Sequence, residues 1–226
     1  MIDRPRLPFA ARHLDPGSRM LEVLFGLIMT LTFTLGAGMM LQEEGREGAR
    51  QMLIATAGCN LAWGVIDGVF YVLGQLFERG RLRRVALGMK QAPSDAEAQE
   101  LVAGELDETL APVTDPSERQ GLYRAIVQRV RSAEIPAHAR VIREDLLGGL
   151  ASGWLVFACS VPAALPFLFI DDPQLALRVS NGLLLALLFF VGYRAARLTM
   201  ARPWLAGTVF LLAGLALVVA AIALGG

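Results

Sequence analysis

The chain has 226 residues, of which 54% are hydrophobic and only 19% are charged, and its mean hydropathy is +0.49. A soluble domain carries about 25% charged residues, so this composition excludes disordered, fibrous and disulfide-stapled classes and predicts an all-α polytopic membrane protein. The 21 basic and 21 acidic residues cancel, so no charge excess favours nucleic acid as a partner.

Long uncharged runs mark the membrane-spanning helices. About 20 apolar residues cross a hydrocarbon core roughly 30 Å thick. Runs of 20 to 25 uncharged residues lie between Glu22 and Glu43, between Asp145 and Asp171, and after Arg202. Strand-type alternation is absent, so helices and not a barrel are expected. The five expected spans are Leu21–Leu41, Gln51–Phe77, Leu146–Ile170, Pro173–Tyr193 and Pro203–Leu224.

Arginine and lysine are distributed unevenly among the segments that join these spans. Four precede the first span, eleven lie between spans two and three, and three lie between spans four and five, whereas the other two loops hold two and one. Basic residues accumulate on the cytoplasmic side of a membrane. We therefore expect the N-terminal segment (1–20) and the middle segment (79–145) in the cytoplasm and the C-terminus outside. Residues 21–78 then contain spans one and two, and residues 146–226 contain spans three to five.

The second span carries the main candidates for an ion path. Asp67 is the only charged residue well inside a span, and it shares one helical face with Asn60, Gly64 and Tyr71. A carboxylate, an amide and a phenol on one stripe can line a path for a cation. The alternative is structural: Gly64 and Gly68 permit close helix packing, and Asp67 bonds a neighbouring helix.

Other polar features of the spans have structural explanations beside functional ones. Thr30 of the first span is a further ion-path candidate, although threonine hydroxyls in spans usually bond their own backbone. Cys59 and Cys159 each lie inside an apolar run and are expected to be small buried hydrophobes. Pro162 and Pro166 free backbone carbonyls that protein, water or an ion must satisfy, which is compatible with a transport path.

The middle segment is expected to be a small helical lobe. Residues 79–90 continue the second span as a helix beyond the bilayer. Ser94 to Glu97 has capping-box spacing and opens a helix to about Leu110, and the stretch 115–118 (DPSE) repeats this signal for a helix to about Ala133. After Pro136, residues 138–145 are expected to be helical and to lead into the third span.

The first helix within this lobe is strongly acidic. It carries six acids and no basic residue: Asp95, Glu97, Glu100, Glu105, Asp107 and Glu108. Carboxylates in i, i+3 pairs on one face can bind hard divalent cations and Fe(II). The next helix carries Arg119, Arg124, Arg129 and Arg131, so ion pairing between the two helices is an equally good explanation.

No motif of a familiar enzyme class occurs. HExxH, CxxC, P-loop and nucleophile-elbow patterns are absent, and His13 and His138 are isolated in the sequence. We expect neither an enzyme nor an organic cofactor.

Four short segments and the overall layout carry a resemblance to a known family. The segments are 25–38 (FGLIMTLTFTLGAG), 57–64 (AGCNLAWG), 160–167 (SVPAALPF) and 192–199 (GYRAARLT). The layout is five spans with a carboxylate-bearing lobe between the second and third. Together these features resemble the vacuolar iron transporter family (VIT1/CCC1-like proteins), of which the chain looks like a divergent bacterial-type member. The resemblance implies an integral protein of the bacterial inner membrane.

The same resemblance implies a homodimer that moves Fe2+ or Mn2+ out of the cytosol, typically in exchange for protons. The family's second-span glutamate falls on Asn60 and its first-span aspartate has no counterpart in residues 27–30, so Asp67 is expected to take over part of their role. The alternative is a non-transporting membrane protein of the same fold that senses metal or binds a partner through its lobe. The implied metal ligands in and after the lobe are Glu97, Glu100, Glu105, Glu108 and Glu144.

Overall fold

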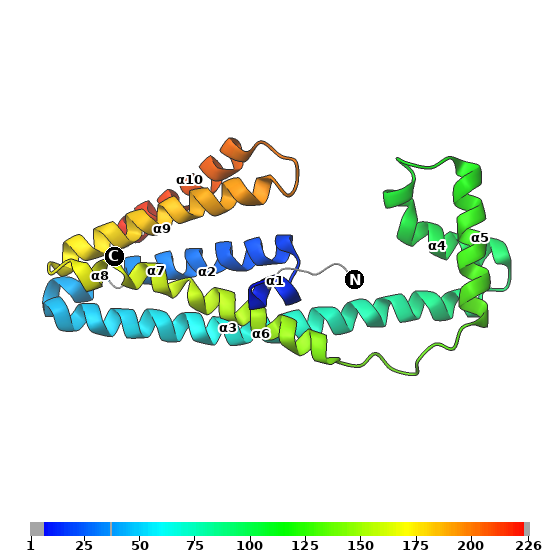
Figure 1. Cartoon of the computed structure of the whole chain (residues 1–226), viewed down its shortest axis with the longest axis horizontal. Helices are drawn as coiled ribbons and strands as arrows, with labels where there is room; N and C mark the ends of the chain where they lie inside the picture. The colour runs from blue at the N-terminus through cyan, green and yellow to red at the C-terminus, as the bar shows by residue number, and fades with distance from the viewer. Residues whose placement is uncertain (1–6, 37, 224–226) are drawn as a thin grey trace. The chain divides into compact units, whose positions relative to one another are not determined.

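The computed structural model describes residues 7–36 and 38–223, and within them the regular structure is entirely helical (Figure 1). The all-α class expected from the composition is confirmed. The chain divides into two compact units: a membrane unit (Met1–Val72 and Arg143–Gly226) and a lobe (Leu73–Ile142). The helices are α1 (Phe9–His13), α2 (Pro16–Gly36), α3 (Gly38–Gln91), α4 (Asp95–Leu110), α5 (Pro116–Ser132), α6 (Arg143–Ala158), α7 (Ser160–Ala164), α8 (Pro166–Phe169), α9 (Pro173–Ala196) and α10 (Pro203–Ala223).

Within the described residues, five helical segments are long and apolar enough to cross a membrane, so the predicted number of spans is confirmed. They are Pro16–Gly36, Gly45–Gln91, Arg143–Phe169, Pro173–Ala196 and Pro203–Ala220. The described part of the first span ends at Gly36, because Ala37 lies outside the described residues, so the expected end at Leu41 stays a prediction. Helix α3 is interrupted at Gly45, whose φ of 58° lies in the left-handed region that favours glycine. The expected last residue, Leu224, lies outside the described residues, as do Arg4 and Arg6.

The first span begins earlier than the expected Leu21 because Asp15 caps it. The Asp15 carboxylate accepts hydrogen bonds from the backbone N–H groups of Gly17 (2.8 Å) and Ser18 (3.0 Å), which have no partner within the helix. The Ser18 hydroxyl donates to the same carboxylate. These hydrogen bonds, with the one from the Ser18 hydroxyl foremost, hold the pKa of Asp15 below its usual value.

The core of the membrane unit forms around α2. Four of its buried leucines recur at helical spacing and pack against the third span and α9. Cys159 belongs to this core and is buried, as expected, whereas Cys59 is partly exposed. The packed residues are Leu24, Leu27, Leu31, Leu35, Cys159, Ala163, Leu184 and Leu188.

The third span is divided into α6, α7 and α8 at its two prolines. A proline inside a helix removes one N–H donor and its ring crowds the carbonyl four residues earlier. The chain leaves regular helix at Cys159, before Pro162, and at Leu165, before Pro166. At this level the Ser180 hydroxyl of α9 donates to the Ala163 carbonyl (2.9 Å), so a neighbouring helix supplies a partner for the broken span.

In the lobe, the capping box predicted at 115–118 is present, whereas Ser94 caps its helix by its side chain alone. The Ser94 hydroxyl accepts a hydrogen bond from the Glu97 backbone N–H (3.2 Å), and the Glu118 carboxylate accepts one from the Asp115 backbone N–H (3.1 Å). These caps begin α4 and α5 where the sequence predicts. The two helices pack on the end of α3 through a small apolar core, formed by Met89, Ala98, Val102, Tyr123 and Val127.

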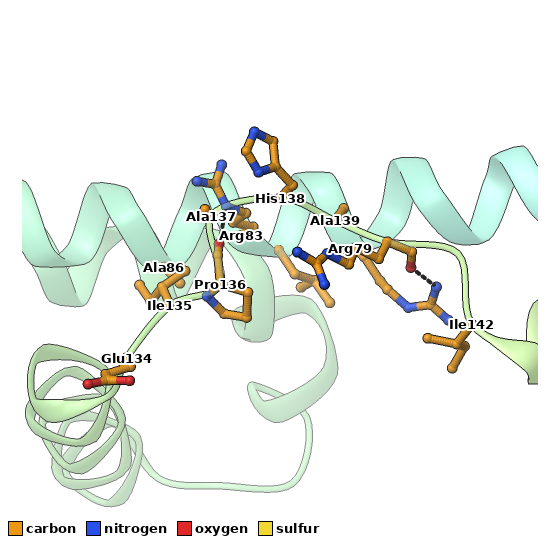
Figure 2. A pocket seen from close by; sticks show the side chains of 12 residues that line it. Arg79, Arg83, Ala86, Glu134, Ile135, Pro136, Ala137, His138, Ala139 and Ile142 are labelled. Atoms are coloured by element: carbon orange, nitrogen blue, oxygen red, sulfur yellow. Dashed lines mark hydrogen bonds between the residues drawn. The ribbon is translucent and has the colours of Figure 1, made fainter.

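The prediction of a helix over residues 138–145 is wrong for 138–142, which form a bend and irregular chain before α6 begins at Arg143. Basic side chains of α3 bind the carbonyls of this linker: Arg83 Nε donates to Pro136 O (2.6 Å), Arg79 Nη1 to Arg140 O (3.1 Å), and Lys90 to Ala133 O. Figure 2 shows Arg79 and Arg83 reaching from α3 to the linker. Because side chains satisfy these carbonyls, the linker does not need the hydrogen bonds of a helix.

Candidate ion path and lobe carboxylates

The two glycines of α3 singled out in the sequence lie against glycines of α6. A Cβ atom at Gly64 would lie 2.6 Å from the Gly153 carbonyl oxygen, and one at Gly68 would lie 2.7 Å from that of Gly149. A contact under 3.0 Å is closer than real Cβ atoms approach, so each position accepts only glycine without movement. The structural explanation of these glycines is confirmed within one chain: they allow α3 and α6 to pack backbone to backbone.

Asn60 lies where α2, α3 and α6 meet, and its side chain is fully buried. Its Nδ2 donates to Thr30 Oγ1 of α2 (2.7 Å) and to the Val156 carbonyl of α6 (3.1 Å). The Thr30 hydroxyl in turn donates to the Gly26 carbonyl (2.7 Å), as expected for threonine in a span. Asn60 therefore ties three spans together with its two amide hydrogens.

Three buried side-chain oxygens in the described residues have no hydrogen-bond partner: Asn60 Oδ1, Asp67 Oδ2 and Ser152 Oγ. All three belong to α3 or α6. Asn60 and Asp67 are one heptad apart on the same face of α3, and Ser152 directly precedes the glycine that contacts Gly64. We call this set, with Thr30, the polar seam.

Tyr71 continues the same face of α3 toward the lobe end of the span. Its ring lies so close to Gly148 of α6 that a Cβ there would be 2.3 Å from Tyr71 Cε1. The ring also packs beside Ala151 of α6 and Leu14. The Tyr71 ring thus packs on α6 next to the glycine contacts of Gly64 with Gly153 and of Gly68 with Gly149. Its part in an ion path stays a prediction.

The acids of α4 divide into paired and exposed groups. Asp95 pairs with Arg131 (2.7 Å) and Asp107 with Arg119 (3.5 Å), both across to α5, as the ion-pairing explanation requires. Glu105 pairs with Arg81 of α3. The Glu97 carboxylate accepts a hydrogen bond from the Ser94 hydroxyl (3.2 Å), and Glu100 and Glu108 are exposed.

Tyr123 strengthens the junction between α4 and α5. Its hydroxyl donates to Asp107 Oδ1 (2.6 Å). This hydrogen bond, with burial adding to it, raises the pKa of Tyr123 above its usual value. Asp107, unlike the other acids of α4, therefore has two partners from α5.

No group of three or more His, Cys, Asp or Glu side chains placed to hold one metal ion occurs in the described ranges. Glu144 lies exposed in the first turn of α6, whereas its neighbour Asp145 is only 3% exposed. The metal-ligand role of Glu97, Glu100, Glu105, Glu108 and Glu144 accordingly stays a prediction.

Three polar residues of the membrane unit were missed or undervalued in the sequence. Asp145 is buried in the first turn of α6, Ser152 contributes one of the partnerless oxygens, and Asn181 of α9 accepts a hydrogen bond from Thr34 (2.9 Å). A polar residue within an apolar run was the available signal, but the sequence does not tell which face of a span meets another helix.

The sequence model of the VIT family matches residues 81–226, well over half of the chain. The chain belongs to the VIT family. A comparison with curated proteins gives no match. The resemblance to vacuolar iron transporters is therefore confirmed, and with it an integral membrane protein whose family is associated with metal-ion transport and not with enzymatic activity.

The VIT match covers the end of α3, the lobe and the last three spans. Of the polar seam it includes Ser152, while Thr30, Asn60 and Asp67 precede it. The family assignment thus rests on a part of the chain other than the α3 face that carries the ion-path prediction.

Proposed function

We propose that this VIT-family protein exports a divalent transition-metal ion, Fe2+ or Mn2+, from the cytosol in exchange for protons. The observation that carries the proposal is the polar seam, with partnerless oxygens on Asn60, Asp67 and Ser152. A buried polar atom without a partner costs about 1–3 kcal/mol, and more within a bilayer. An oxygen-lined seam is stabilised when a cation or water passes through it.

The donors of the seam suit such a cargo. An amide carbonyl, a carboxylate and a hydroxyl are hard oxygen ligands of the kind that Mn2+ and Fe2+ accept. Asn60 and Asp67 are separated by seven residues, which is about 10 Å along a helix. Because metal–oxygen bonds are only about 2 Å long, the two residues serve successive positions of one ion and not a single site.

Asp67 supplies the proton in this mechanism. A carboxyl group removed from water favours its neutral form, so Asp67 holds a proton while no cation is near. An arriving divalent ion favours the carboxylate and displaces that proton. Metal movement in one direction is thereby coupled to proton release, which is the minimal chemistry of exchange.

Flux measurements in proteoliposomes test this function. The wild-type protein, reconstituted with a metal-sensitive dye and a pH-sensitive dye, should move Fe2+ or Mn2+ together with protons. Asp67→Asn should keep the fold and lose metal-dependent proton movement. The matched control is Asp171→Asn, because Asp171 is 96% exposed at its side chain and forms only a surface ion pair with Arg46.

Two results would contradict the proposal. Wild-type flux in Asp67→Asn would exclude this carboxylate from the path, and loss of folding in that variant would make Asp67 a structural hydrogen-bonding residue. No flux in the wild type, combined with metal binding to the lobe, would instead favour the second candidate function: a non-transporting sensor.

We further propose that the lobe contributes a cation site through Glu97, Glu100, Glu105 and Glu108, and that Glu144 is a metal ligand, as the family resemblance implies. Support comes from the exposure of Glu100, Glu108 and Glu144, which leaves their carboxylates accessible to an ion. Calorimetry with Mn2+ on the intact protein should detect binding, and the quadruple Glu→Gln variant of the α4 residues should abolish it. Unchanged binding in that variant would leave α4 as an ion-pairing helix.

The homodimer and the orientation complete the proposed function. The family resemblance supports the dimer, whereas Gly64 and Gly68 do not, because they contact α6 of the same chain. A monomeric mass in mild detergent and in nanodiscs would exclude a dimer. For orientation, cysteines introduced at Gly104 and Gln174, both exposed, should be labelled from the cytoplasmic and the outer side of the inner membrane, respectively.

A further inference from the structure

A groove of about 710 Å3 runs along the lobe where α3 emerges from its apolar stretch. It lies between α3 and the linker 134–142, whose course beside the helix is visible in Figure 2. Its lining combines basic and apolar side chains, among them Arg79, Arg83, Arg140, Leu82 and Ile142. We call it the linker groove.

The position of the linker groove along α3 corresponds to the headgroup layer of a bilayer. Phe77 is the last apolar residue before the first charge of the stretch, Glu78. Arg79 and Arg83 follow Phe77 by about 3 and 9 Å along the helix axis, at 1.5 Å per residue. The interfacial layer on each side of the hydrocarbon core is roughly 5–8 Å thick. By distance along the helix, Arg79 therefore falls within this layer and Arg83 close to its outer edge.

The groove has more basic than acidic side chains, and some of their N–H donors are not used within the described residues. Apart from Arg79, its lining holds two arginines, Arg83 and Arg140, against one acid, Glu134. Arg83 uses its Nε–H for the Pro136 carbonyl, which is neutral, and keeps its charge and its other N–H donors. The exposed Arg140 contributes its backbone carbonyl to Arg79, and its guanidinium forms no ion pair in the part of the chain that the structure describes.

The apolar part of the lining suits an amphiphile better than a soluble anion. Leu82 and Ile142 are 49% and 47% exposed, although both are large aliphatic side chains. Both border the same groove as the arginines. A ligand with a phosphate at one end and hydrocarbon at the other satisfies both kinds of side chain at once.

We propose that the linker groove binds an anionic phospholipid, with its phosphate on Arg83 and Arg140 and its acyl chains along Leu82 and Ile142. The bound lipid would fix the linker against α3 at the point where the chain returns to the membrane. This proposal is independent of whether the protein moves metal.

The test is a lipid titration followed by native mass spectrometry. Delipidated full-length protein in detergent is titrated with phosphatidylglycerol, with phosphatidylcholine and with inorganic phosphate. The wild type should retain phosphatidylglycerol and discriminate against the other two. The Arg83→Gln/Arg140→Gln variant should bind phosphatidylglycerol about 30-fold more weakly, from about 1 kcal/mol per basic residue at a membrane surface. Arg140→Gln alone, which disturbs no side-chain contact, should weaken it about fivefold.

The control is Arg124→Gln/Arg129→Gln, which makes the same change of charge on exposed positions of α5 away from the groove. It should bind phosphatidylglycerol like the wild type. Equal weakening in the control would show diffuse attraction to positive charge, and equal retention of phosphatidylcholine would show a merely hydrophobic surface. Inorganic phosphate that competes at similar concentration would show a site for soluble anions. Each of these results would overturn the proposal.

Discussion

Replacing Gly64 by alanine tests whether the close contact of α3 and α6 holds the membrane unit together. The added Cβ would lie 2.6 Å from the Gly153 carbonyl oxygen, about 0.8 Å short of the 3.4 Å at which ordinary contact begins. The atom it meets belongs to backbone and cannot turn aside, so the two helices must separate locally. Overpacking of this kind costs about 1–3 kcal/mol.

The matched control is Gly58→Ala on the same helix, where a Cβ would meet nothing within 4 Å. Alanine is favoured over glycine in a helix by about 0.8–1.0 kcal/mol, and both variants gain this term, so their difference isolates the clash. We expect Gly64→Ala to unfold about 1–3 kcal/mol more easily than Gly58→Ala, measured by thermal unfolding in one detergent. Gly153→Ala should not add fully to Gly64→Ala, because both disrupt one contact. Equal stability of the Gly64 and Gly58 variants would refute the packing argument.

Three further outcomes are expected. Asn60→Leu removes the amide hydrogens that Asn60 donates to Thr30 (2.7 Å) and to the Val156 carbonyl (3.1 Å). The variant should be destabilised by about 1–3 kcal/mol in the same thermal unfolding assay. An unchanged unfolding midpoint would mean that these hydrogen bonds do not join the spans. The folded-state pKa of Asp15 is lowered, so its cap contributes stability above the unfolded pKa of about 3.9, and this contribution is lost as pH falls through the folded value. Asp15→Ala should therefore lower the unfolding midpoint at pH 7 and have no effect at the acidic end of a pH series. Tyr123 has a raised pKa, so Tyr123→Phe should remove a step above the usual tyrosine pKa of about 10 from an ultraviolet tyrosine titration and should destabilise the lobe. Loss of a step at the usual pKa would contradict the Asp107 hydrogen bond.

The sequence alone determined those features of the helices that depend on neighbouring residues in the chain or on contact with the bilayer. Long apolar stretches, three of them without any charge, predicted all five spans, because a bilayer disfavours charge wherever it lies in the fold. The starts of α4 and α5 were predicted from Ser94 and Asp115, because a cap bonds residues only three positions away. The position of α2 was predicted less well, since the cap at Asp15 lies before the apolar run that marked the span.

Tertiary structure alone decided which faces meet. The sequence indicates that another helix packs closely against Gly64. Only the fold shows that this helix is α6 of the same chain, at Gly153, and not a helix of a second copy. Residues 138–142 have a sequence compatible with a helix, yet they are irregular, and Arg83, more than 50 positions before Pro136, binds the carbonyl of that residue in the same linker. Asn60 acquires its two partners from α2 and α6 in the same way. These contacts join residues far apart in the chain, and their free energy depends on the orientation of whole helices, which no local pattern of residues contains.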